Sequence, residues 1–281
     1  MTIVAGVAGW PIAHSLSPLL HAYWLREYAV DGAYVPLAIT REDFSTALDG
    51  LRRAGFAGLN VTVPHKEAAF ALAHSLDEDA RIAGAANLLL FRPHGTIEGR
   101  NTDALGLASS LREEFGPDVV RDKPAVLLGA GGAARGAVLA LAREGASEIR
   151  ILNRDRNKRD GLAAHLKSRV PCTVSAAGLD GWPDAARDAA LVVNATSAGM
   201  TGNAPLDLPL AALPSTAALY DLVYNPLETD LVRRARSRGL RAANGLGMLM
   251  HQAVPAFAAF YGITPKVTPE LRAHLEQAPH A

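Results

Sequence analysis

A glycine-rich turn near the middle of the chain limits the possible folds more than any other feature. A short apolar run at residues 125–128 is typical of a buried parallel strand. It leads into Gly129-Ala130-Gly131-Gly132-Ala133-Ala134, and a helix-forming stretch continues to residue 143. This order binds dinucleotides, because the glycines let backbone amides approach a pyrophosphate and the helix start offers it partial positive charge. The sequence therefore predicts a nicotinamide cofactor; the alternative is a turn that serves only the fold.

The segment after the next strand predicts which nicotinamide cofactor is used. A strand predicted at residues 148–152 ends about 20 residues after the turn, where such folds place the residue that reads the ribose. A carboxylate there binds a ribose 2′-hydroxyl and repels a 2′-phosphate, so Asp155 favours NAD. Three cations of the same segment, Arg154, Arg156 and Lys158, outnumber this carboxylate, and we therefore predict NADP. The alternative is that the segment is only a run of solvated charges. The segment reads Asn153-Arg154-Asp155-Arg156-Asn157-Lys158.

Strand-like and helix-like segments alternate along the 281 residues, which predicts an α/β fold of parallel sheets covered by helices. Before the glycine turn we expect three strands, at residues 3–9, 34–39 and 57–63. The pattern predicts two domains: residues 1–102 plus 246–281 form a substrate-binding domain, and residues 103–245 form a Rossmann-type NADP-binding domain. Helices expected at residues 247–260 and 269–277 return to the first domain.

Composition excludes several classes of partner. Lys plus Arg and Asp plus Glu number 28 each, so the net charge of zero gives no reason to expect a nucleic acid. No apolar run is long enough for a membrane span. The single Cys172 has no CxxC or zinc spacing, so we expect it to pack at a strand edge, and no histidine spacing indicates a metal. We predict a soluble cytoplasmic protein without a metal, and a homodimer is one alternative for its assembly.

Polar residues follow two predicted strands of the first half, where α/β sheets bind ligands. Ser15 and Ser17 come after the first strand, although Ser17 before a proline is equally typical of a helix N-cap. Thr62 and Lys66 follow the third strand, and a lysine in a first helical turn opposes the helix dipole. Asp103 lies between the two halves. A lysine and an aspartate can hold a substrate hydroxyl and move its proton; a surface lysine and a helix cap are the alternatives.

Eight motifs, in the same order and over nearly the whole chain, resemble those of the shikimate dehydrogenases. They are His14-Ser15-Leu16-Ser17-Pro18, Asn60-Val61-Thr62-Val63-Pro64-His65-Lys66, Gly84-Ala85-Ala86-Asn87, Asn101-Thr102-Asp103, Gly129-Ala130-Gly131-Gly132-Ala133, Asn194-Ala195-Thr196-Ser197-Ala198-Gly199-Met200, Tyr220-Asp221-Leu222-Val223-Tyr224-Asn225-Pro226 and Asn244-Gly245-Leu246-Gly247-Met248-Leu249-Met250-His251-Gln252.

The resemblance implies reversible reduction of 3-dehydroshikimate to shikimate with NADPH, in aromatic amino-acid biosynthesis. It implies that Lys66 and Asp103 are catalytic and that the substrate is held by Ser15, Ser17, Thr62, Asn87, Tyr224 and Gln252. Cofactor contacts are expected at Gly129, Ala130, Gly131, Gly132, Ala133, Asn153, Arg154, Asp155, Lys158, Leu222 and Gly245. Asp155 departs from the family, whose NADP-using members carry a hydroxyl residue there. An NAD-using quinate/shikimate dehydrogenase and a non-catalytic dinucleotide sensor are the alternative functions.

Overall fold

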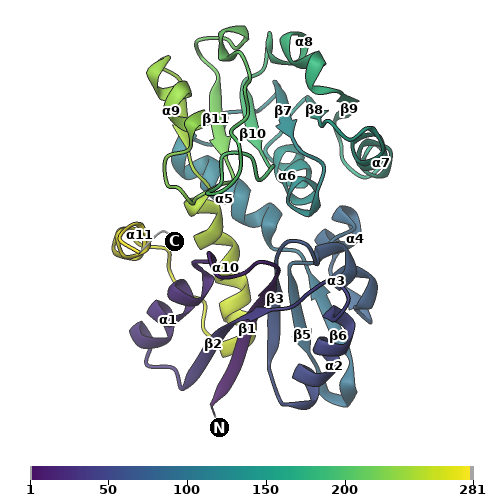
Figure 1. Ribbon diagram of the computed structural model, residues 1–281, viewed down its shortest axis with the longest axis vertical. Helices are drawn as coiled ribbons and strands as arrows, with labels where there is room; N and C mark the ends of the chain where they lie inside the picture. The colour runs from purple at the N-terminus through teal and green to yellow at the C-terminus, as the bar shows by residue number, and fades with distance from the viewer. Residues whose placement is uncertain (1, 279–281) are drawn as a thin grey trace. The chain divides into compact units, whose positions relative to one another are not determined.

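The structure, a computed structural model, describes residues 2–278 (Figure 1). The chain divides into two compact units. Unit 1 comprises Met1–Thr102 and Leu249–Ala281, and unit 2 comprises Asp103–Met248. In Figure 1 unit 1 runs from purple to blue and includes the yellow C-terminal helices, whereas unit 2 runs from teal to green. Each unit has its own six-stranded sheet, and the predicted α/β class is confirmed.

Unit 1 is built on a mixed sheet with the strand order β2-β1-β3-β5-β6-β4. Its strands are β1 (Ile3–Gly9), β2 (Gly32–Ala38), β3 (Gly58–Val61), β4 (Ser75–Leu76), β5 (Leu88–Phe91) and β6 (Ile97–Arg100). Its helices are α1 (Ser17–Glu27), α2 (Phe44–Arg53), α3 (Lys66–Leu72), α4 (Glu78–Ala83), α10 (Leu246–Tyr261), which begins in unit 2, and α11 (Pro269–Glu276).

The sheet of unit 1 differs from the three parallel strands expected from the sequence. β1 pairs in parallel with β2 and β3 as expected, but β5 runs antiparallel to both β3 and β6. β5 and β6 form a hairpin that turns through Pro93–Gly95. Reversal of β5 brings its first residue to the edge of the sheet where β3 and β6 end, which gathers polar side chains from three strands at one edge.

Unit 2 is a fully parallel sheet with the strand order β12-β11-β10-β7-β8-β9. Its strands are β7 (Pro124–Leu128), β8 (Glu148–Leu152), β9 (Thr173–Ala177), β10 (Leu191–Asn194), β11 (Ala218–Asp221) and β12 (Arg241–Ala243). Its helices are α5 (Asp103–Phe115), α6 (Gly132–Arg143), α7 (Arg156–Leu166), α8 (Trp182–Ala186) and α9 (Asp230–Ser237). Read from β9 to β12, this is the strand order of a Rossmann fold, and it reverses between β7 and β10.

Apolar strand residues form the core of unit 2, because strands of a parallel sheet are covered on both faces. Val126, Val192 and Leu219 are fully buried there and pack in one cluster with Trp182 of α8. Cys172 lies just before β9 and is half-buried, and burial raises the pKa of its thiol. No helix within residues 2–278 is long and apolar enough to cross a membrane.

Candidate active site

Most of the side chains predicted to bind the substrate lie at one edge of the unit 1 sheet, by which we mean the end where β1, β3 and β6 finish. Ser15 follows β1, Thr62 follows β3, and Thr102 follows β6. Asn87 immediately precedes β5, which reaches the same edge because it runs antiparallel to β3. The edge that the sequence predicted from the ends of β1 and β3 therefore also receives residues from β5 and β6.

Asn87 is the centre of a hydrogen-bond network at this edge. Its Nδ2 donates to Thr102 Oγ1 at 2.9 Å and to Gln252 Oε1 at 3.3 Å, and its Oδ1 accepts from the Thr102 amide at 2.8 Å. Asn60 Nδ2 donates to the Asn87 carbonyl, and Tyr34 donates to Asn60 Oδ1 at 2.8 Å. Asn87 and Thr102 are buried. The amide of Asn87 is thus held in one orientation, and α10 supplies Gln252 from the far end of the chain.

Thr102 belongs to this network although it was not among the predicted substrate residues. Its hydroxyl lies 2.9 Å from Asn87 Nδ2 and 3.4 Å from Gln252 Oε1. The available signal is the run Asn101-Thr102-Asp103, from which the sequence predicts only a helix cap and a carboxylate. Recognising Ile97–Arg100 as a strand parallel to β3 would have placed Thr102 beside Asn87.

Lys66 is the first residue of α3, and the histidine before it anchors this helix. The buried ring of His65 lies 2.8 Å through Nε2 from the Ile39 carbonyl and stacks on Phe44 at 4.3 Å. Burial lowers the pKa of His65, so the ring is neutral at physiological pH and can serve this structural contact. The Lys66 carbonyl also accepts from the Ala86 amide at 2.9 Å. The backbone that carries Lys66 is therefore fixed next to Asn87.

The segment with Ser15 and Ser17 differs from the helix N-cap interpretation of Ser17. The residues before α1 form a turn, and Leu16, not Ser17, is the N-cap. Ser17 is already helical, and its amide donates to Ser15 Oγ at 3.3 Å. The Ser15 hydroxyl thus satisfies a free amide at the helix start, which removes the need for a capping side chain at Ser17.

The glycine turn in unit 2 has the shape of a phosphate cradle. Gly129 has φ +109°, and a Cβ there would lie 3.0 Å from the Ala195 carbonyl oxygen, so the turn after β7 lies against the end of β10. This is the point where the strand order reverses and where such folds bind ligands. Gly131 is the N-cap of α6 without a capping side chain, and a Cβ at Gly131 would meet no atom of the described residues within 4 Å. The open space above the first amides of α6 fits a pyrophosphate.

The basic segment after β8 shows why an aspartate is tolerated there. Asp155 is the N-cap of α7, and its Oδ1 accepts from the Lys158 amide at 3.1 Å. A serine or threonine would serve the same cap, so the family's hydroxyl residue and this aspartate are structural equivalents. Within residues 2–278 Arg154 has neither a hydrogen-bond nor an ion-pair partner and is exposed. A solvent-facing guanidinium beside the ribose position fits a 2′-phosphate.

A buried carboxyl organises the loop that carries Leu222 and Tyr224. Asp221, at the end of β11, accepts hydrogen bonds from Asn194 Nδ2 at 2.8 Å, the Val223 amide at 3.1 Å and Thr229 Oγ1 at 2.7 Å. Complete burial raises its pKa, and the three donors oppose that shift. A Cβ at Gly245 would lie 2.0 Å from the Leu222 carbonyl oxygen, so only glycine allows the end of β12 to approach this loop.

The predicted residues therefore fall into two groups, each within one unit. Unit 1 brings together the edge with Ser15, Thr62, Lys66, Asn87 and Gln252. Unit 2 carries the glycine turn, the basic segment, the loop after β11 with Tyr224, and Asp103 as the first residue of α5. Asp103 follows Thr102 by one peptide bond, so the chain passes directly from the Asn87 network to this carboxylate.

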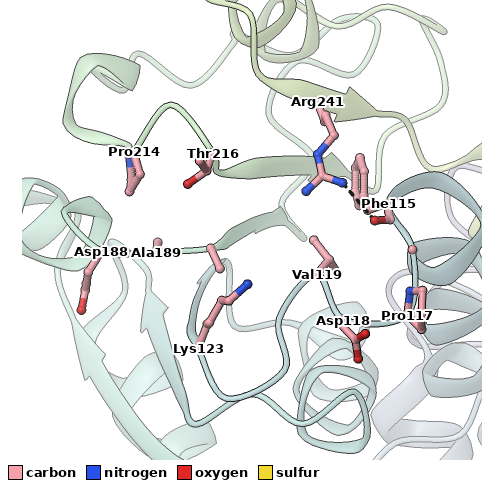
Figure 2. A pocket seen from close by; sticks show the side chains of 12 residues that line it. Phe115, Pro117, Asp118, Val119, Lys123, Asp188, Ala189, Pro214, Thr216 and Arg241 are labelled. Atoms are coloured by element: carbon pink, nitrogen blue, oxygen red, sulfur yellow. Dashed lines mark hydrogen bonds between the residues drawn. The ribbon is translucent and has the colours of Figure 1, made fainter.

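A cavity of about 390 Å³ in unit 2 lies away from these residues (Figure 2). Its walls come from segments that precede β7, β10 and β11, and Lys123 and Arg241 extend toward it. Asp188 in its wall pairs with Arg150, whose hydrogen bond lowers the pKa of that carboxyl. Ligands of α/β sheets bind at the carboxyl ends of strands, and this cavity is at the amino ends, so it is not the candidate active site. The described residues contain no group of three His, Cys, Asp or Glu side chains placed to hold a metal ion.

Known proteins resemble both units. A family model described as the shikimate dehydrogenase substrate binding domain matches residues 7–89, and one described as shikimate / quinate 5-dehydrogenase matches residues 110–201. The curated shikimate dehydrogenase (NADP(+)) of Paramagnetospirillum magneticum is 50% identical over 273 residues, which is 96% of each chain.

Solved structures resemble the whole chain. Shikimate 5-dehydrogenase from Thermus thermophilus, in complex with NADP(H) and shikimate, has 34% identity and a TM-score of 0.83 with 98% of both chains covered. Quinate dehydrogenase from Corynebacterium glutamicum in complex with NAD has 29% identity and a TM-score of 0.88, with 97% of this chain and 98% of that chain covered. From both family models and a relative that is half identical along nearly the full length, we conclude that the chain belongs to the shikimate dehydrogenase family.

Proposed function

We propose that this chain is an NADP-dependent shikimate dehydrogenase, which interconverts shikimate and 3-dehydroshikimate. The observation that carries the proposal is the conjunction of two sites in one chain. The Asn87 network in unit 1 offers amide and hydroxyl groups suited to a small polyhydroxy acid. The glycine turn and the exposed Arg154 in unit 2 offer groups suited to a phosphorylated dinucleotide.

We assign substrate binding to unit 1 and cofactor binding to unit 2. Ser15, Ser17, Thr62, Asn87 and Gln252 would hold the carboxylate and ring hydroxyls, together with Tyr224 from unit 2. The bonds of Gln252 Oε1 to Asn87 and Thr102 are long, at 3.3 and 3.4 Å. Long bonds are weak and exchange readily for a substrate hydroxyl. Asn87 itself keeps its orientation through the shorter bonds to Thr102.

Lys66 and Asp103 would carry the proton chemistry. A bound NADP would supply the hydride acceptor needed to oxidise the carbinol carbon of shikimate. The hydroxyl on that carbon must lose its proton in the same conversion, and Lys66 and Asp103 would hold this hydroxyl and pass the proton toward solvent. In the reverse direction the same groups would return a proton to the forming alkoxide. The fixed backbone at His65 and Lys66 supports this role, because a proton carrier must be held within hydrogen-bond reach.

The cofactor phosphates would be held by the amides of the glycine turn, with contacts along Ala130, Gly132 and Ala133 and near Leu222 and Gly245. Arg154 would pair with the 2′-phosphate, with Asn153 and Lys158 beside it. The repulsion of that phosphate by Asp155 is offset in part by Lys158, whose Nζ lies 3.9 Å from Asp155 Oδ2. Cytoplasmic location and a homodimer stay predictions from the sequence.

A spectrophotometric assay of NADPH or NADH formation tests the proposal with shikimate or quinate as substrate and NADP or NAD as cofactor. We expect the highest kcat/KM with shikimate and NADP. Quinate carries an extra hydroxyl on the carbon that bears its carboxylate, and an unpaired buried polar group costs about 1–3 kcal/mol. This corresponds to a disadvantage of about 5- to 150-fold. Comparable kcat/KM for quinate would move the chain to the quinate/shikimate class, and binding of dinucleotide without turnover of either acid would indicate a sensor.

A further inference from the structure

A buried glycine of the nucleotide-binding helix touches the residue that we assign to proton transfer. Gly136 lies in the interior of α6. Glycine in a helix interior destabilises the helix relative to alanine, so a glycine at this position needs an explanation. A Cβ at Gly136 would lie 2.6 Å from Asp103 Cβ, 3.5 Å from Asp103 Oδ2 and 3.6 Å from the Ala104 amide nitrogen. The first turn of α5 therefore rests on the bare backbone of α6 at this point.

Two further contacts hold α5 in place beyond its first turn. Arg112 binds Glu144 at the end of α6 through two hydrogen bonds, Nε to Oε2 at 2.9 Å and Nη2 to Oε1 at 2.6 Å. On another side, Ser110 Oγ lies 2.7 Å from the hydroxyl of Tyr220 in β11. Because these contacts fix the later turns of α5, a side chain at position 136 could be accommodated only by displacement of the first turn.

We propose that Gly136 is a positioning residue that sets the place of the Asp103 carboxylate relative to the helix that binds the cofactor. The inference rests on the role proposed above for Asp103. In the proposed function α6 binds the pyrophosphate at its N-terminus, and Gly136 lies one turn further along. The same helix therefore fixes the positions of both the cofactor and the carboxylate. The absence of a side chain at Gly136 allows Asp103 to lie this close to α6.

The expected displacement follows from the contact distance. Carbon atoms in van der Waals contact are separated by about 3.5 Å or more, so a methyl group at position 136 must move Asp103 Cβ by about 1 Å. That atom is attached directly to the backbone and cannot move away by a side-chain rotation. A misplacement of this size costs up to about 100-fold in rate when proton transfer depends on the geometry.

The test is Gly136→Ala, with Gly161→Ala as the matched control. Gly161 is exposed in α7, and among residues 2–278 no atom would lie within 4 Å of a Cβ there. For Gly136→Ala we expect kcat to fall about 10- to 100-fold, with the KM values for shikimate and NADP within about threefold of wild type. The control should keep wild-type kinetics. An unchanged kcat in Gly136→Ala would overturn the proposal.

A double-mutant cycle with Asp103→Asn separates positioning from a general structural effect. If Gly136 acts through Asp103, adding Gly136→Ala to Asp103→Asn should reduce kcat by less than about twofold further. Multiplicative losses would overturn the proposal. Wild-type activity of Asp103→Asn alone would instead refute the catalytic role of Asp103, which makes the two failures distinguishable.

A cycle on thermal stability covers the case in which Gly136→Ala is too unstable to assay. Asp103→Gly removes the Cβ that the new methyl group would meet, so Gly136→Ala should lower the Tm far less in that background than in the wild type. The same Tm loss in both backgrounds would overturn the proposal.

Discussion

His21 should make unit 1 sensitive to mild acid. The ring is 1% exposed, and within the described residues neither Nδ1 nor Nε2 has a hydrogen-bond partner. It stacks on Tyr34 at 3.7 Å with an interplanar angle of 8° and lies among Trp24 and Phe257. Burial among these rings lowers its pKa from 6.5 to about 3, because an imidazolium there would lose its hydration without gaining a partner.

The sign and size of the effect follow from this pKa. The unfolded chain binds a proton at His21 below about pH 6.5, whereas the folded chain does not until about pH 3, so stability is lost as the pH falls through this window. One pKa unit corresponds to about 1.4 kcal/mol. Between about pH 7 and pH 5 the loss from this residue amounts to about 2 kcal/mol, which corresponds to a Tm decrease of about 4–8 °C.

The assay compares the wild type with His21→Phe, which keeps a flat ring and removes the titrating nitrogens. Urea unfolding is followed by tryptophan fluorescence, to which Trp24 contributes from the same cluster. From about pH 7 to pH 5 the wild type should lose about 2 kcal/mol more than His21→Phe. The carboxylates and His65 are common to both proteins, so their contributions cancel.

His94→Asn serves as the control, because His94 is exposed and its positive φ of 62° suits asparagine. This variant should lose stability in parallel with the wild type. Equal losses in His21→Phe and the wild type would refute the reasoning, since the buried ring would then accept a proton in the folded state.

Two predictions concern the proposed active site. Lys66→Ala should lower kcat by about 10²–10⁴-fold and leave the equilibrium Kd for shikimate within about fivefold of wild type; near-normal turnover would remove Lys66 from the mechanism. Arg154→Ala should raise the KM for NADP by about 10- to 150-fold, the equivalent of a charge-assisted bond of about 1.5–3 kcal/mol, and leave the KM for NAD unchanged. Arg156→Ala is its matched control, because Arg156 is also exposed but pairs with Asp160 in its own helix, and equal effects of the two variants would contradict a specific contact.

Local features of unit 2 could be predicted well from the sequence. β8 was predicted with its observed bounds, and the glycine turn lies between β7 and α6 as expected. These elements are specified by neighbouring residues: an apolar run, glycines, and a helix-forming segment. The order of the strands across the sheet depends on contacts between distant residues. No local pattern predicts this order, and it is implied only by the predicted Rossmann class of fold.

The sheet of unit 1 could not be predicted to the same extent. β5 is a run of only four residues, Leu88–Phe91, and an apolar run of this length does not indicate the direction in which it pairs. The hairpin with β6 determines that direction. Its turn at Pro93–Gly95 includes His94 in a left-handed conformation, and a histidine in the sequence does not predict such a conformation as a glycine would. Thr102 was missed for the same reason, because its place beside Asn87 depends on β6.

The reversed strand explains how unit 1 builds a polar site on a largely apolar sheet. In a fully parallel sheet, only residues that follow strands reach the carboxyl edge, and each belongs to a separate loop. Here β5 begins at that edge, so Asn87, which immediately precedes β5, lies there. Its side-chain amide is beside Thr102, which follows the end of β6. The backbone of Asn87 is fixed by pairing, since its carbonyl accepts from the Val61 amide at 2.8 Å and its amide donates to the Arg100 carbonyl at 3.0 Å. Asn87 is therefore held on both sides by strands, and a side chain anchored on a strand is positioned more precisely than one on a loop.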